Sequence, residues 1–233
     1  MKIHRLIPAC VLVLAACGGA QVIRSDPLGV VYEARSPAVE SAEGPFEPLR
    51  AVDGALALPS LGTVVLGSSV RELRIAYRYP LIQGVPRPFL RLVESPEGAM
   101  GMLAEWRDGP EPWKRENGRP ATSCTAHADE IWSCVDVLPL PGGVTWQEVA
   151  DELTRLGAWT VREPCDPENA WTSESGEVVI ERLDHDRYET YRCHAPTRRS
   201  GGTGKQVGAL YEYLAGLVAR TASESKGPRP GGA

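Results

Sequence analysis

Apolar and polar positions alternate along several short stretches in the middle of the chain. The segments GTVVLG, VRELRIAYRYP, PFLRLVES and GMLAEWRD contain many β-branched or aromatic residues and are bounded by Gly or Pro, which is typical of β-strands. In the second segment, Leu73, Ile75 and Tyr77 fall on one side, opposite Glu72 and Arg74. This alternation predicts a sheet with one packed face and one face mostly exposed to water.

Two later segments follow the helical period instead. The first, VTWQEVADELTRLGAW, begins with a capping box of Thr145 and Glu148 and ends at Gly157. Its apolar positions share one face: Trp146, Val149, Ala150, Leu153 and Leu156. The second has its apolar stripe at Val207, Leu210, Tyr211, Leu214, Leu217 and Val218. Both are expected to lie across a sheet.

The segments EVVIERL and RYETYRC read as a hairpin around Asp184, His185 and Asp186. The expected register pairs Arg182 with Glu189, Ile180 with Tyr191 and Val178 with Cys193. The order of strands, helix, hairpin and helix predicts an α+β fold. Its sheet is mainly antiparallel, carries two amphipathic helices packed on one face, and is stabilised by disulfides.

The N-terminal segment has the layout of a secretory signal peptide. A positive head with Lys2 and Arg5 precedes an apolar run from Leu6 to Ala16, which at about 11 residues is shorter than the about 20 needed to span a bilayer. The run ends in LAAC, which resembles the lipobox of bacterial lipoproteins. That resemblance implies cleavage before Cys17 and a lipid, such as palmitate, on the new terminus. An ordinary cleaved signal peptide is the alternative.

The resemblance also implies a location. The residue after the cysteine is Gly18 rather than aspartate, as in lipoproteins sorted to the outer membrane. We therefore expect a lipid-anchored protein of the cell envelope, on the outer membrane and facing the periplasm if the host is Gram-negative.

Composition divides the chain into four parts. Residues 1–16 form the signal peptide, and residues 17–48, rich in Ala, Pro, Glu and Ser, are expected to be a flexible tether. A single α+β domain is predicted over residues 49–221, followed by a disordered tail over residues 222–233.

The charge of the chain argues against two classes of partner. Without Lys2 and Arg5 the chain carries 23 basic and 30 acidic residues, a formal charge of −7. Nucleic acid phosphates and anionic lipid head groups repel such a surface, so no nucleic acid partner is expected, and no attraction of the domain to anionic lipid.

Four cysteines remain beyond the signal peptide and Cys17: Cys124, Cys134, Cys165 and Cys193. An even number in an oxidising compartment predicts disulfides, with three possible connectivities. We favour Cys124 with Cys134 and Cys165 with Cys193. A zinc site is the alternative, but the chain has no CxxC pair, so neither a metal nor another cofactor is expected.

Two motifs suggest chemistry without completing a site. RSGGTGKQ lacks the first glycine and the final Ser or Thr of a phosphate-binding loop, because Arg199 and Gln206 stand there. Asp184, His185 and Asp186 offer an imidazole beside carboxylates, as do His127 and its acidic neighbours. No nucleophile motif accompanies either group, so no catalytic residue is assigned.

Binding is the expected activity. Trp113 and Trp171 lie in segments rich in Pro and Glu and are the candidates for a surface binding site. The last 80 residues or so, through LGAW and YRCHAP, resemble uncharacterised bacterial lipoproteins, which implies structural roles for Trp159, Glu181 and Arg192. The sequence thus predicts a non-enzymatic binding or assembly module for an envelope protein or glycan. An envelope hydrolase using His and carboxylate residues is the alternative.

Overall fold

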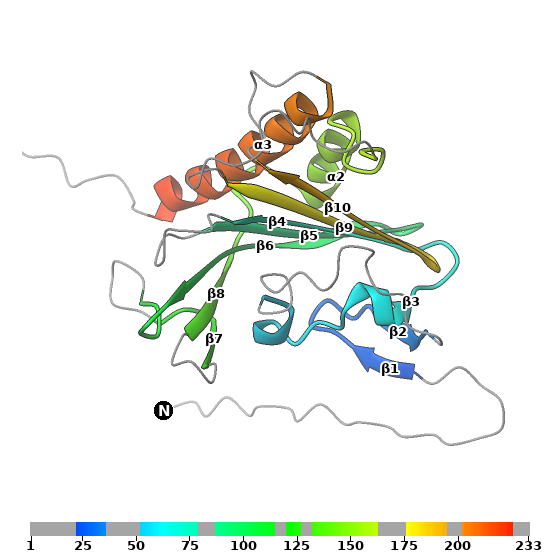
Figure 1. Ribbon diagram of the computed structural model, residues 1–233, viewed down its shortest axis with the longest axis horizontal. Coiled ribbons are helices and arrows are strands. Elements are labelled where there is room, and N and C mark those ends of the chain that lie inside the picture. Colours follow the sequence, from blue (N-terminus) through cyan, green and yellow to red (C-terminus); the bar gives the residue numbers. More distant parts are fainter. Residues whose placement is uncertain are drawn as a thin grey trace, which may run out of the picture.

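The fold has three layers, with a large sheet in the middle (Figure 1). The computed structural model describes residues 22–35, 52–78, 87–114, 120–126, 132–162, 176–194 and 202–225. Two helices cover one face of the large sheet, and the N-terminal part of the described chain covers the other.

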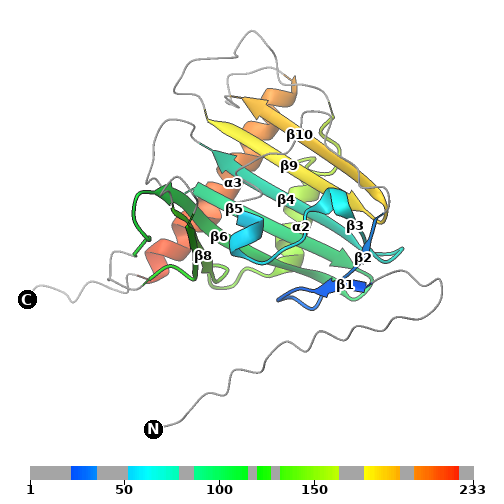
Figure 2. The same ribbon diagram turned by 60° about the horizontal axis from the view of Figure 1, so that its bottom comes forward.

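The large sheet is antiparallel throughout. Within the described residues it has seven strands in the order β10-β9-β4-β5-β6-β8-β7. Its strands are β4 (Arg71–Arg78), β5 (Arg87–Ser95), β6 (Gly98–Gly109), β7 (Ser123–Ala126), β8 (Trp132–Leu138), β9 (Glu177–Asp184) and β10 (Arg187–His194). Figure 2 shows β4, β5 and β6 side by side at its centre.

The helices α2 (Trp146–Arg155) and α3 (Gly202–Ser225) lie together on one face of this sheet. Between them and the strands is the main apolar core, which includes Leu73, Ile75, Leu153 and Leu214. The predicted fold class, α+β with two helices on one face of an antiparallel sheet, is confirmed.

Local signals in the sequence place these elements accurately. Thr145 and Glu148 form the predicted capping box at the start of α2, and Gly157 has a φ of +79° just after its end. The β9–β10 hairpin has the predicted register, because Glu189 pairs with Arg182 and Tyr191 with Ile180.

The second face of the large sheet is buried as well. Glu72 and Arg74, which the alternation of β4 had placed in water, are both 0% exposed. Apolar side chains surround them, among them Ala76, Phe89 and Val93. The prediction of a mostly wet face is therefore wrong, because a further layer of chain covers it.

Part of that layer, the β1–β2 hairpin, comes from the segment predicted to be a flexible tether. Strands β1 (Val22–Ser25), β2 (Val31–Ala34) and β3 (Val64–Val65) form a small sheet beside the 3-10 helix η1 (Leu61–Thr63). The Tyr32 side chain in β2 is fully buried. The predicted tether of residues 17–48 is therefore wrong for residues 22–35, and the folded region begins before residue 49.

Two smaller differences concern the C-terminal part. Helix α3 continues to Ser225, beyond the predicted domain end at residue 221. It also begins at Gly202, so Gly204, Lys205 and Gln206 of the RSGGTGKQ motif are helical. Cys17, His127, Cys165 and Trp171 lie outside the described residues.

Candidate functional site

A cluster of buried charged side chains and tyrosines lies between the large sheet and the N-terminal layer. We call it the buried charge network and define it as Asp26, Tyr32, Asp53, Glu72, Arg74, Arg91, Glu181 and Tyr188. Because β4 and β5 pair with Arg74 opposite Arg91, both guanidinium groups point to the same face of the sheet.

Glu72 is the centre of this network. Its Oε1 accepts from the Nε of Arg74 and from the Nε of Arg91, at 2.8 Å each. Burial alone would raise the pKa of Glu72, but the two guanidinium groups lower it below its usual value. Glu72 is therefore held ionised between two arginines, away from water.

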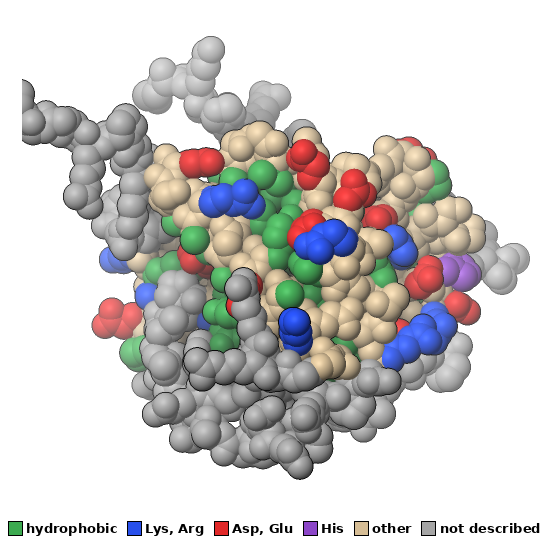
Figure 3. Space-filling view, turned by 90° about the horizontal axis from the view of Figure 1, so that it is seen from above, with side chains coloured by type: hydrophobic (Ala, Val, Ile, Leu, Met, Phe, Trp, Pro, Cys, Tyr) green, Lys and Arg blue, Asp and Glu red, His purple; other side chains and the backbone are tan. Residues whose placement is uncertain are grey.

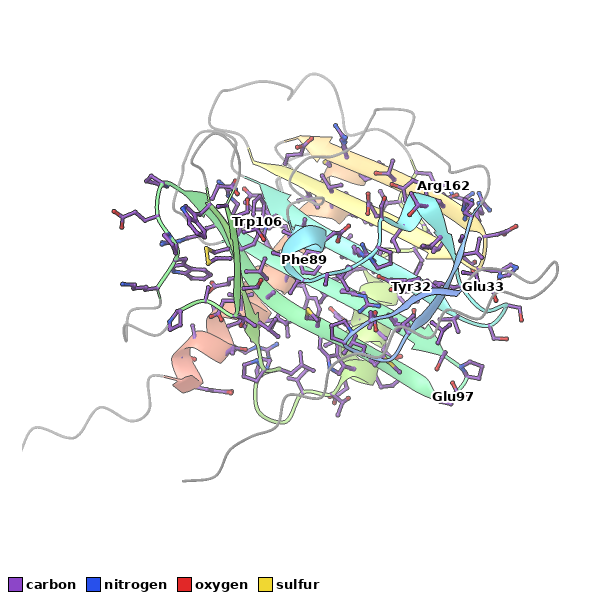
Figure 4. All side chains as sticks on the ribbon, turned by 90° about the horizontal axis from the view of Figure 1, so that it is seen from below. Tyr32, Glu33, Phe89, Glu97, Trp106 and Arg162 are labelled. Carbon is purple, nitrogen blue, oxygen red and sulfur yellow. A yellow bond between two sulfur atoms is a disulfide. The ribbon has the colours of Figure 1, made fainter. Side chains whose placement is uncertain are left out.

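The N-terminal segment supplies the next two members. The Tyr32 hydroxyl donates to Glu72 Oε2 at 2.5 Å and accepts from Arg91 Nη2 at 2.6 Å. Asp26 forms an ion pair with the same Arg91 nitrogen. Figure 4 shows Tyr32 under the large sheet, viewed from the side of the small sheet. Two residues of a single hairpin are thus joined to two strands of the large sheet.

Asp26 also builds the turn that joins β1 to β2. Its Oδ1 accepts from the backbone N–H groups of Leu28 and Val30, at 2.8 and 2.9 Å. This arrangement is a side-chain turn of the kind that Asp and Asn favour. One carboxylate therefore shapes the hairpin with one oxygen and attaches it to Arg91 with the other.

Asp53 and Glu181 extend the network on the side of Arg74. Asp53 Oδ2 lies 2.8 Å from Arg74 Nη1, and Glu181 Oε1 accepts from the Tyr188 hydroxyl at 2.9 Å. Burial raises the pKa of Asp53 to about 7, although Arg74 opposes the rise. Burial also raises the pKa of Glu181. These two carboxyl groups therefore take up a proton more readily than Glu72, whose pKa is lowered.

The buried charge network has a structural role. Its charged side chains are nearly inaccessible to solvent, and they join segments far apart in the sequence, as Asp26 does with Arg91 and Asp53 with Arg74. A substrate cannot reach groups buried in this way without displacement of the N-terminal layer. The arrangement joins layers of the fold and presents no open reaction centre.

The histidine expected at the hairpin tip has a structural contact. His185 has a φ of +53°, and its Nδ1 lies 2.7 Å from the carbonyl oxygen of Leu66. Asp184 and Asp186 beside it are exposed. The structure therefore ties the tip to the segment after β3. His127 lies outside the described residues, and the side chain of His194 is not described.

The cysteines follow the sequence prediction where they are described. Cys124 and Cys134 form a disulfide between β7 and β8, at directly opposed positions. Cys193 is buried and disulfide-bonded. Its predicted partner, Cys165, lies outside the described residues, so that pairing stays a prediction. Among the described side chains, no three His, Cys, Asp or Glu residues come close enough together to hold a metal ion.

The tryptophan candidates for a binding surface receive no support. Trp113 is only 7% exposed, and the guanidinium group of Arg107 lies 5.0 Å from the centre of its ring. Its backbone N–H donates to the Sγ of Cys134 at 3.2 Å. The prediction of an exposed Trp113 is wrong, because its side chain is buried, with the guanidinium group of Arg107 over the ring. Trp171 lies outside the described residues.

Sequence reasoning missed the buried charge network, although two signals pointed toward it. Glu72 and Arg74 stand two apart in one predicted strand, and Arg91 stands in the middle of the next, so charges of opposite sign share one face. In addition, VIRSDPLGVVYEA places an Asp-Pro-Leu-Gly turn between two β-branched runs, which is a hairpin signal.

Comparisons with known proteins identify no relative of this chain. No family model, no curated protein and no solved structure matches this chain. None of the described helices has the length and hydropathy of a membrane span.

Proposed function

We propose that this protein is a lipid-anchored protein of the bacterial envelope whose domain acts as a non-enzymatic binding or assembly module. The observation that carries the proposal is the LAAC sequence at the end of a short apolar run, which resembles a lipobox. A lipid on Cys17 would hold the domain at the membrane, on the outer membrane and facing the periplasm in a Gram-negative host.

The disulfide between Cys124 and Cys134 supports export. Disulfides form and persist in oxidising compartments and are rare in the cytosol. This bond is therefore consistent with the compartment that the signal peptide implies.

The roles of the reactive side chains favour binding over catalysis. The His185 ring contacts a backbone carbonyl, and the carboxylates of Asp26 and Glu72 are taken up by Arg91. The hydrolase hypothesis relied on the hairpin tip or on His127 and its acidic neighbours. The histidine of the tip has a structural contact, so this hypothesis is the less supported of the two. The formal charge of −7 favours an envelope protein with a basic surface over an acidic partner. A glycan is the other class of ligand to examine.

Cross-linking in the native membrane tests this proposal. The chain would carry a tag after Ala233, and Cys17→Ser would serve as the unanchored form. Cys10→Ser, in the same apolar run, is the matched control, because it should leave lipidation intact. We expect one protein or glycan to be captured reproducibly with the native and Cys10→Ser chains and to be lost with Cys17→Ser. Capture of abundant lipoproteins alone would contradict a stable binding role. Equal capture of the partner by the Cys17→Ser chain would contradict the proposed role of the anchor.

A further inference from the structure

We infer that the layer formed by β1, β2 and β3 faces the head groups of the membrane that carries the anchor, and that α2 and α3 face away from it. This inference rests on the proposed lipid anchor at Cys17. To the proposed anchor it adds the orientation of the domain, with one face toward the membrane and the other toward the periplasm or its equivalent.

The first argument is the length of chain between the anchor and the fold. Strand β1 begins at Val22, and only four residues separate Cys17 from it. Five Cα-to-Cα steps span at most about 18 Å even when fully extended. A tether reaching to residue 48 would have given the domain free orientation, but the start of β1 holds the small sheet close to the lipid.

The second argument is that the small sheet cannot turn independently of the large one. The buried charge network attaches the β1–β2 hairpin to β4 and β5 through Asp26 and Tyr32. At the other end of the small sheet, the Arg35 guanidinium donates to the carbonyl of Asp186 in the β9–β10 turn. The backbone N–H of Leu66 donates to the His185 carbonyl at 2.9 Å. A short connection to one layer therefore orients the whole domain.

The third argument is the position of the layers. The small sheet and the two helices lie on opposite sides of the large sheet (Figure 1). On β2, Val31 and Glu33 point outward, and Val31 is 54% exposed, the large apolar side chain most open to solvent among the described residues. The helix side, in Figure 3, shows acidic and basic side chains interspersed over its described part. That side is the one left open to an envelope partner.

Photo-cross-linking to lipid tests the orientation. The full lipidated chain would be reconstituted in vesicles of phosphatidylethanolamine and phosphatidylglycerol, with benzoylphenylalanine replacing Val31 in β2. Replacement of Thr154 in α2 or Lys205 in α3, both exposed positions, provides the matched controls on the helix side. A second form of each chain would carry about twenty Gly and Ser residues between Gly19 and Ala20, enough for a root-mean-square reach of about 25 Å.

The expected result is a several-fold higher yield of lipid adduct at Val31 than at Thr154 or Lys205, and a fall to the control level with the inserted spacer. Equal yields at the three positions of a lipidated chain would overturn the orientation and leave the anchor intact. The mass of the N-terminal peptide separates the two claims. A peptide without lipid would overturn the anchor and, with it, this inference.

Discussion

At the scale of single residues, Asp26 links the local shape of the N-terminal hairpin to the rest of the molecule. One carboxylate oxygen accepts from the backbone of the turn, and the other pairs with Arg91. An asparagine at this position could still accept the hydrogen bonds of the turn, but it would have no charge to pair with Arg91. A substitution at Asp26 can therefore weaken the ion pair with Arg91 and keep the turn between β1 and β2.

We predict that Asp26→Asn lowers the free energy of unfolding by about 2 to 3 kcal/mol, because Arg91 loses a charged hydrogen-bond partner in a buried site. Urea unfolding measures the change. The matched control is Glu152→Gln, which also turns a carboxylate into an amide, in an exposed pair with Arg155. That change should stay below about 1 kcal/mol. Equal losses in the two variants would contradict an energetic role for the network.

The network is better explained by specificity than by net stability. Asp53 Oδ1, Arg74 Nη2 and Arg91 Nη1 are buried and have no hydrogen-bond partner among the described residues. Buried charges with unmet hydrogen bonds add little stability, and well-packed apolar residues often do better. The charges instead restrict the β1–β2 hairpin to one position. If the hairpin moved, an ion pair would break and leave an unpaired charge buried among apolar side chains.

The carboxyl group of Asp53 predicts a pH dependence of known sign. Its pKa is about 7 in the fold and close to 4 in an unfolded chain. The folded state therefore binds the proton more tightly, so raising the pH from about 4 to about 7 should reduce the free energy of unfolding. Relative to an Asp53→Asn variant, the native chain should lose stability across this window and change no further above it. Urea unfolding at a series of pH values measures this. If the native chain instead gained stability relative to Asp53→Asn between about pH 4 and about pH 7, the prediction would be refuted.

At the scale of elements, strong local signals were enough to predict α2 and the β9–β10 hairpin. The capping box, the glycine at the end of α2 and the hairpin register depend on residues near one another in sequence. Strands β1 and β2 were missed because polar, Pro-rich sequence follows them, and that composition dominated the interpretation of the whole segment. The burial of Tyr32 depends on partners about 40 to 60 residues away, Glu72 and Arg91, which no local pattern reveals.

The junction of α2 with α3 gives a prediction at this scale. Gly157 has a φ of +79°, and a Cβ there would overlap the Gln206 side chain of α3, which donates to the Leu156 carbonyl. Gly143 has a φ of +77° with open space around it. We expect Gly143→Ala to lower the free energy of unfolding by about 1 to 2 kcal/mol, the effect of conformation alone.

Gly157→Ala should be more damaging than Gly143→Ala, because it adds the steric conflict with α3. Thermal unfolding compares the two. Adding Gln206→Ala to Gly157→Ala should recover part of the difference, since it removes the conflicting side chain. Equal losses of stability in the two glycine variants would contradict a steric conflict between residue 157 and Gln206.

At the scale of the whole molecule, the large sheet is enclosed between two unlike layers. The helix layer covers one face with an apolar core, as the periodicity predicted. The other face keeps charges on β4 and β5 that are typical of a solvent-exposed strand. A pattern of apolar and polar positions cannot distinguish a charge in water from one paired beneath another layer. That is why the sequence predicted the sheet and its helices but neither the third layer nor the charge network.

The central claim is that the N-terminal segment is part of the folded domain rather than a tether. Hydrogen exchange measured by mass spectrometry on the full-length Cys17→Ser protein tests it most directly. Backbone amides over Val31–Ala34, in the middle strand of the small sheet, should exchange at least about a hundredfold more slowly than those of an unstructured chain. Asp26→Asn should speed exchange there and leave α2 unchanged. If the amides of Val31–Ala34 exchange at the rate of an unstructured chain in the protein with Asp26 intact, the N-terminal segment is not part of the folded domain.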